Sequence, residues 1–216
     1  MNLVSFSGQK MNEICIFGDD ESKKCNVILH MVNCIHEMYE KDKTRIVLVD
    51  NIEKSMKQLS GIVDEYICNE EKVTDIFENV YEEVQKRYEQ YIIDVDNVSY
   101  SNSPYILIVN SQDVTENISA SKELNAKYKE MLKKYRKMGV YFIFTFLEDA
   151  AIPYNSCEIV KGMKDHKNAI SVTGNIKEVK LLDVNSGVAK TLKSLEDDNI
   201  YYFSGASVQR VKLIQS

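Results

Sequence analysis

The stretch EICIFGDDESKKCN, residues 13–26, decides how this chain begins to fold. It opens with the apolar run EICIF, reaches Gly18, and passes through charged residues into a segment with apolar side chains at helical spacing. The members of that helical stripe are Val27, Met31, Val32, Ile35, Met38 and Tyr39. An apolar run, a glycine and a helical stripe in this order predict a buried strand, a turn and a helix.

Further apolar runs predict more strands of the same kind. Compact β-branched or aromatic runs occur at 45–50 (RIVLVD), 105–109 (YILIV) and 140–146 (VYFIFTF), and a weaker run lies at 65–68. After Pro153 the short runs EIV, AISV, IYYF and VQRVKLI predict closing β-strands, partly antiparallel.

Two more helices are expected between these strands. Asn69 is a candidate N-cap for a long helix with an apolar stripe of about six turns. Another helix is expected from Ser119 to Met138, with Gly139 just past its end. The expected fold class is therefore α/β, a mainly parallel sheet flanked by helices with closing β-strands at the C-terminus.

Composition narrows the classes of protein that this chain can belong to. A chain of 216 residues with 44% hydrophobic residues predicts a single domain over 1–216. The net charge of −6 argues against nucleic-acid binding. The five cysteines and three histidines are scattered without a zinc-binding pattern, so no metal site is expected. No apolar run approaches the roughly 20 residues of a membrane span.

Residues 18–25 match part of the phosphate-binding pattern G-x-x-x-x-G-K-[ST]. In the working form, backbone N–H groups cradle phosphates, the lysine reaches the terminal phosphates and the hydroxyl binds Mg²⁺. Gly18 and Lys24 fit this pattern. Lys23 replaces the second glycine, and Cys25 replaces the hydroxyl residue with a sulfur that Mg²⁺ does not favour.

The loop between these positions is acidic. Its charges, with the two lysines included, sum to −3 + 2 = −1, which opposes a polyanion. The loop residues are Asp19, Asp20, Glu21 and Ser22. Residues 18–25 are thus candidates for a degenerate nucleotide-binding loop, and a charged surface turn that begins a helix is the open alternative.

A phosphate-loop ATPase also needs acids at the end of a second buried strand, to hold Mg²⁺ and activate water. The candidate strand here ends in Asn110 and Ser111, which are neither strong bases nor charged ligands. Asp113 follows two residues too late. No catalytic residue is therefore assigned.

The order of these motifs resembles the FtsK/SpoIIIE-type P-loop ATPase domains, which have a RecA-like fold. The elements that carry the resemblance are ICIFGDDESKKCN, RIVLVD, a helix with EEVQKRYEQY, SPYILIVNSQDV and KMGVYFIFTF. Gly139 and Thr145 match a strand that begins after Gly and ends in Thr, and Lys86 and Arg87 match a basic pair. The segment IYYFSGASVQRVKLIQS resembles the end of the last ATPase module of type VII secretion ATPases of the EssC/EccC/YukB kind.

The resemblance implies a module from a larger, membrane-anchored polypeptide at the cytoplasmic face of the cell membrane. Its implied partners are small helical secretion substrates of the Trp-x-Gly type and neighbouring ATPase modules, with no nucleic acid and no membrane span in this chain. The leading hypothesis is a non-hydrolysing module that needs no cofactor and that binds substrate or regulates its neighbours. The alternative is a divergent active ATPase that uses ATP and Mg²⁺ through Lys24, with parts supplied by a neighbouring module.

A third hypothesis treats the chain as an unrelated interaction domain that docks through a basic helix face. Seven basic residues gather on that segment, and only Glu123 and Glu130 oppose them. The basic residues are Lys122, Lys127, Lys129, Lys133, Lys134, Arg136 and Lys137.

Overall fold

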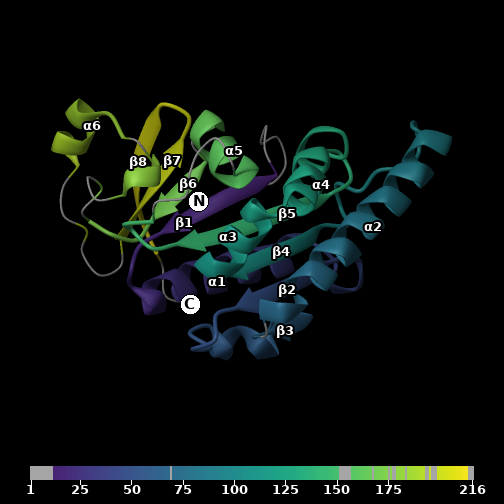
Figure 1. Cartoon of the computed structure of the whole chain (residues 1–216), viewed down its shortest axis with the longest axis horizontal. Helices are drawn as coiled ribbons and strands as arrows, with labels where there is room; N and C mark the ends of the chain where they lie inside the picture. Colours follow the sequence, from purple (N-terminus) through teal and green to yellow (C-terminus); the bar gives the residue numbers. More distant parts are fainter. Residues whose placement is uncertain are drawn as a thin grey trace.

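The structure is a computed structural model that describes residues 12–68, 70–150, 157–166, 168–174, 176, 179–182, 184–192, 195 and 199–213. Its centre is one sheet with the strand order β3-β2-β4-β5-β1-β6-β7-β8 (Figure 1). The strands are β1 (Glu13–Phe17), β2 (Arg45–Asp50), β3 (Glu65–Ile67), β4 (Tyr105–Asn110), β5 (Val140–Phe146), β6 (Ala169–Ser171), β7 (Asn199–Ser204) and β8 (Ser207–Lys212). Pairing is parallel from β3 to β6 and antiparallel at β7 and β8, which confirms the predicted α/β class.

Helices cover both faces of this sheet. They are α1 (Glu21–Met38), α2 (Val73–Ile93), α3 (Gln112–Ala120), α4 (Lys122–Lys133), α5 (Glu158–His166) and α6 (Ser186–Thr191), with short 3-10 turns at 41–43, 57–61, 70–72 and 180–182. The helix α1 packs on one face with Ile16, Leu48 and Ile108. On the other face α2, α3, α4 and α5 pack against Phe17, Val49 and Phe142. Successive strand residues thus enter opposite halves of the core, as the pleat requires.

The helix expected over 119–138 is instead two helices. Ser121 has an extended backbone and separates α3 from α4. Its N–H donates to the Asn117 carbonyl, and its Oγ accepts from the Leu124 N–H at 3.3 Å. One serine thus ends α3 and caps α4, because a short hydroxyl side chain competes well for backbone groups. The part of α3 before Ser119 was not predicted.

Two other boundaries differ from the expectation. The segment EIV lies in α5 and not in a strand, because a short apolar run alone does not separate a strand from a buried helix. The helix α2 begins at Val73, after a 3-10 turn over Glu70–Lys72. The expected N-cap, Asn69, lies outside the described residues.

Candidate functional site

The turn between β1 and α1 spans residues 18–20, so Lys23, Lys24 and Cys25 lie within the helix. Gly18 has a φ of +142°, and a Cβ there would lie 2.4 Å from Val172 Cγ2, so the turn requires glycine. Asp20 is the N-cap of α1, and its Oδ1 accepts from the Lys23 N–H at 2.9 Å. A carboxylate of the chain itself therefore occupies one of the backbone donors that a phosphate would use at a helix N-terminus.

Lys24 is buried, with only 2% of its side chain exposed. Its Nζ lies 2.5 Å from Glu21 Oε1, one turn earlier on the same helix. The other carboxylate oxygen of Glu21 accepts from Ser55 Oγ at 2.8 Å. A buried ammonium needs a charged partner. Here Glu21, a residue of the loop pattern, provides that partner.

Asp50, at the end of β2, is fully buried. Its Oδ1 accepts from the Asn51 N–H at 3.0 Å and from Asn110 Nδ2 at 2.8 Å. Its Oδ2 accepts from the Met56 N–H at 2.9 Å and from the Tyr66 hydroxyl at 2.7 Å. Burial is the main cause that raises the pKa of the Tyr66 phenol, and the hydrogen bond to Asp50 is the second. All of these donors fix the carboxylate in place.

Asn110, at the end of β4, joins Asp50 to the first turn of α1. Its Nδ2 also donates to Ser55 Oγ at 2.9 Å, and its Oδ1 accepts from Thr145 Oγ1 at 2.6 Å. Ser55 in turn bonds Glu21, and Glu21 bonds Lys24. We call this continuous set the inner polar network: Glu21, Lys24, Asp50, Ser55, Tyr66, Asn110 and Thr145.

The other candidate residues have structural roles. Ser111 Oγ accepts from the Val114 N–H at 3.2 Å and so caps α3. Cys25 lies on the buried face of α1, and its Sγ accepts from Gln58 Nε2 at 2.9 Å. Burial raises the pKa of this thiol, which keeps it protonated.

A cavity of about 350 Å³ lies over the network at the carboxyl ends of β2, β4 and β5. Open parallel sheets bind ligands at this edge. Its charged lining is Glu21, Glu53, Asp113 and Lys24, which sums to −3 + 1 = −2. Ile52 and Leu147, both exposed, form an apolar part of the wall. The cavity has the place of a nucleotide site and the wrong charge for one.

Arg87, one of the two basic residues that match the family pattern, lies away from this cavity. Arg87 Nη1 donates to the carbonyls of Ser103 at 2.7 Å and Met138 at 3.0 Å, just before β4 and β5 begin. Gly139 has a φ of +69°, and a Cβ there would lie 2.4 Å from the Tyr100 carbonyl. Arg87 and Gly139 thus hold the amino ends of these strands, opposite the cavity.

Sequence reasoning missed two members of the network. Ser55 follows β2 on an irregular loop, and Tyr66 lies on the short edge strand β3. Neither belongs to a motif. Tyr66 reaches Asp50 because β3 pairs with β2, and the loop after β2 brings Ser55 to Asn110 and Glu21. Among the described residues, no group of three or more His, Cys, Asp or Glu side chains can hold a metal ion, and no helix is long and apolar enough to cross a membrane.

The sequence matches no protein-family model and no curated protein. Solved structures with the same architecture do match. EssC (ATPases 2 and 3) from Geobacillus thermodenitrificans has 18% identity and a TM-score of 0.68, over 94% of this chain and 36% of that one. Thermomonospora curvata EccC (ATPases 2 and 3), in complex with a signal sequence peptide, has 16% identity and a TM-score of 0.66, over 94% and 36%.

The cytoplasmic domain of the Thermomonospora curvata type VII secretion ATPase EccC also matches, with 16% identity and a TM-score of 0.66, over 95% of this chain and 24% of that one. This chain therefore spans between about a quarter and just over a third of the length of these proteins. At such low identity the likeness concerns the fold. The resemblance inferred from the order of motifs is confirmed at that level: this chain has the fold of the ATPase modules of type VII secretion ATPases.

Proposed function

We propose that this chain is a non-hydrolysing ATPase-like module of a type VII secretion ATPase, which binds a partner or regulates neighbouring modules. The observation that carries the proposal is the ion pair between Lys24 and Glu21, inside the inner polar network. In a working loop this lysine faces the terminal phosphates. Here its charge is neutralised within its own helix.

The residues present do not fit a magnesium nucleotide. The N–H of Lys23 is bonded to Asp20, and the charged lining of the cavity is net negative. A triphosphate would have to displace Glu21 from Lys24 and then lie beside its carboxylate. Close contact between like charges costs about 1 kcal/mol in water and several times more near a protein.

Water activation also lacks a base. Asn110 uses its amide inside the network, and Asp50 is buried beneath four donors. Asp113 is the exposed acid nearest to the strand end, on the first turn of α3. In the described part of the chain, no hydrogen bond or ion pair orients its carboxylate.

The direct test is Mg²⁺-dependent ATP turnover by the chain and by its Lys24→Ala variant. The proposal expects the same background rate from both. Turnover by the wild type that Lys24→Ala abolishes would contradict it.

A second function is favoured by the cavity itself. Its volume of about 350 Å³ lies within the range of small-molecule sites, at the edge where nucleotides bind in such sheets. A divergent ATPase that is completed by a neighbouring module, with ATP and Mg²⁺, would use this space. Lys24→Ala and Asn110→Ala in the longer protein test it, because activity there should fall only if this cavity contributes.

The partners and location follow from the same proposal. We infer that small helical secretion substrates of the Trp-x-Gly type and neighbouring modules are the partners, at the cytoplasmic face of the cell membrane. The support is the fold and the EccC modules solved with a signal sequence peptide. Titration of such a substrate into the chain should give saturable binding that added ATP does not change.

A further inference from the structure

The helix α2 extends past the sheet that it covers. Its apolar stripe is buried at Val73, Ile76, Phe77, Val80 and Val84. At the next positions of the same stripe, Tyr88 and Tyr91 are half-buried, and Ile92 is 54% exposed. Figure 1 shows this end of α2 projecting beyond the strands. The stripe thus continues for a full turn beyond the core that its first part covers.

A cavity of about 480 Å³ lies beside this end of α2, remote from the inner polar network. Tyr88, Tyr91 and Tyr141 supply its aromatic lining. The ring of Tyr88 packs edge-on against Tyr135, with 5.0 Å between ring centroids. This contact fixes one wall before any partner arrives, which reduces the entropy cost of binding.

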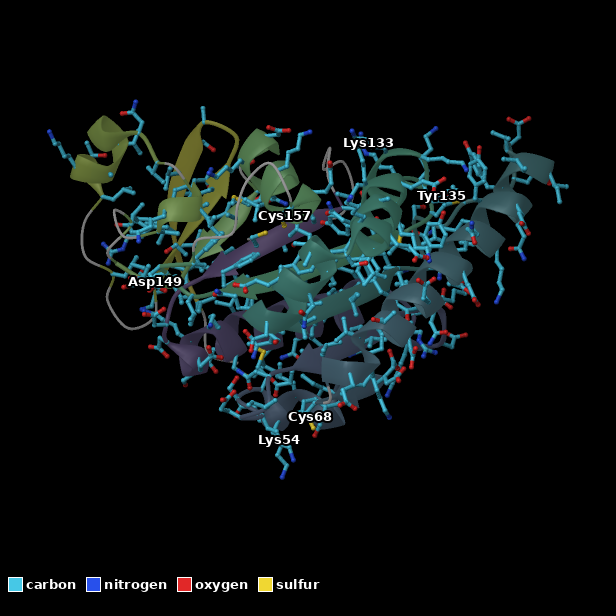
Figure 2. All side chains as sticks on the ribbon, in the orientation of Figure 1. Lys54, Cys68, Lys133, Tyr135, Asp149 and Cys157 are labelled. Carbon is cyan, nitrogen blue, oxygen red and sulfur yellow. The ribbon has the colours of Figure 1, made fainter. Side chains whose placement is uncertain are left out.

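The rest of the lining is largely basic. Its cations are Lys133, Lys134, Arg136 and Lys137, and no acid among the described residues lines the cavity. Lys134 is held in place by Glu130 at 3.0 Å and lies over the rings of Tyr88 and Tyr135. Figure 2 shows Tyr135, just past the end of α4, on the side toward α2.

Lys133 and Lys137 differ from the other lysines of this segment. Lys127, Lys129 and Lys134 all form ion pairs with glutamates. Lys133 and Lys137 are exposed, and neither has an ion pair with any residue in the described part of the chain. Of the basic face predicted over 122–137, three lysines are thus neutralised by glutamates, whereas Lys133 and Lys137 at this cavity are not.

We propose that this cavity, the basic tyrosine cavity, binds an acidic peptide segment that carries an aliphatic or aromatic side chain. The tyrosines that line the cavity offer apolar surface to the side chain, and the cations of the lining offer charge complementarity to the carboxylates. The net charge of −6 on the whole chain repels long polyanions. A short acidic segment that contacts only this cavity is therefore favoured. The proposal goes beyond the proposed function, and each can fail without the other.

The experiment titrates a fluorescent peptide of alternating Glu, Leu and Phe into the full chain and follows anisotropy. The wild type should bind it, and added salt should weaken the binding. The double variant Lys133→Glu and Lys137→Glu should bind about tenfold more weakly, since two rim contacts become repulsive. Tyr91→Ser removes one aromatic ring of the lining and should also weaken binding.

Matched controls separate local from general charge. Lys41→Glu with Lys57→Glu makes the same change in net charge at two exposed lysines far along the chain, and should bind like the wild type. Equal binding by the rim variant and this control would overturn the proposal. Equal binding of a peptide with Ser in place of Leu and Phe, or binding of phosphatidylserine vesicles but not of the peptide, would also overturn it. The outcome of this binding experiment does not depend on whether the chain hydrolyses ATP.

Discussion

Lys24 Nζ and Glu21 Oε1 lie 2.5 Å apart in the first turn of α1, at the position where a phosphate loop would present its lysine to a nucleotide. The pair is not isolated, because Ser55 bonds the other oxygen of Glu21 and Asn110 bonds Ser55. The charge of Lys24 is thus balanced by a carboxylate of the chain itself.

The first prediction concerns this ion pair. Glu21→Ala leaves the Lys24 ammonium buried without its carboxylate, so the free energy of unfolding should fall by about 1–3 kcal/mol. This loss is smaller than that of a fully buried broken pair, because Glu21 is 35% exposed. Pyrophosphate should restore part of the loss, because it supplies the missing anion. Urea unfolding with and without pyrophosphate measures both, with Glu37→Ala on the exposed face of α1 as the control. A loss no larger than that of Glu37→Ala would contradict the role of the pair.

The second prediction concerns the strand-end amide. Asn110→Asp restores an acid where the ATPase pattern has one, but places it 2.8 Å from Asp50 in a buried site. The pKa of the new carboxyl should be raised in the folded state, by burial and by the neighbouring charge. A raised folded-state pKa means that stability falls as the pH rises, so the deficit relative to wild type should grow from acid to neutral pH. Thermal unfolding across this range tests it, and a pH-independent deficit would count against the arrangement described.

The third prediction concerns the hydroxyl that closes the network. Tyr66→Phe removes one donor to the buried Asp50 carboxylate and should lower the free energy of unfolding by about 1.5–3 kcal/mol. Tyr39→Phe is the control, since Tyr39 lies outside the network at the end of α1. Chemical denaturation should separate the two variants clearly. Similar values for both would show that the bond to Asp50 contributes little.

The fourth prediction concerns Glu13, which is 3% exposed at the start of β1 and bonds the Tyr128 hydroxyl. Burial raises the pKa of Glu13 to about 8. Because the unfolded chain ionises this group near its ordinary value of 4.5, stability should be greatest below that pH and fall by up to about 1.4 kcal/mol for each pH unit toward 8.

Glu13→Gln should remove this slope, because the amide stays neutral and still fills the space beside Gly162. Unfolding of both proteins from pH 5 to pH 8 provides the comparison, with Glu37→Gln as a matched exposed substitution. Parallel slopes for wild type and Glu13→Gln would refute the assignment.

The sheet could be predicted from sequence because its strands are dense apolar runs such as RIVLVD and YILIV. In a chain of this length, such fully apolar runs are typical of strands that a parallel sheet buries on both faces. The division of the predicted helix at Ser121 could not be predicted in the same way. A serine is tolerated inside helices, and only the observed bonds to Asn117 and Leu124 show that it ends one helix and begins another.

The site was predictable in part. The order of Gly18, Lys24 and Asn110 along the chain indicated which strand ends meet, and the acidic loop indicated a mismatch with phosphate. The partner of Lys24 was not predictable, because whether Glu21 points outward or toward the lysine depends on where α1 begins. That start is set by the Asp20 cap, which the phosphate-loop pattern places inside the loop.

The central claim is that the internal ion pair has replaced nucleotide binding, and calorimetric titration of ATP with Mg²⁺ into the full chain tests it most directly. The account predicts no saturable heat for the wild type or for Lys24→Ala. One-site binding by the wild type that Lys24→Ala abolishes would contradict it.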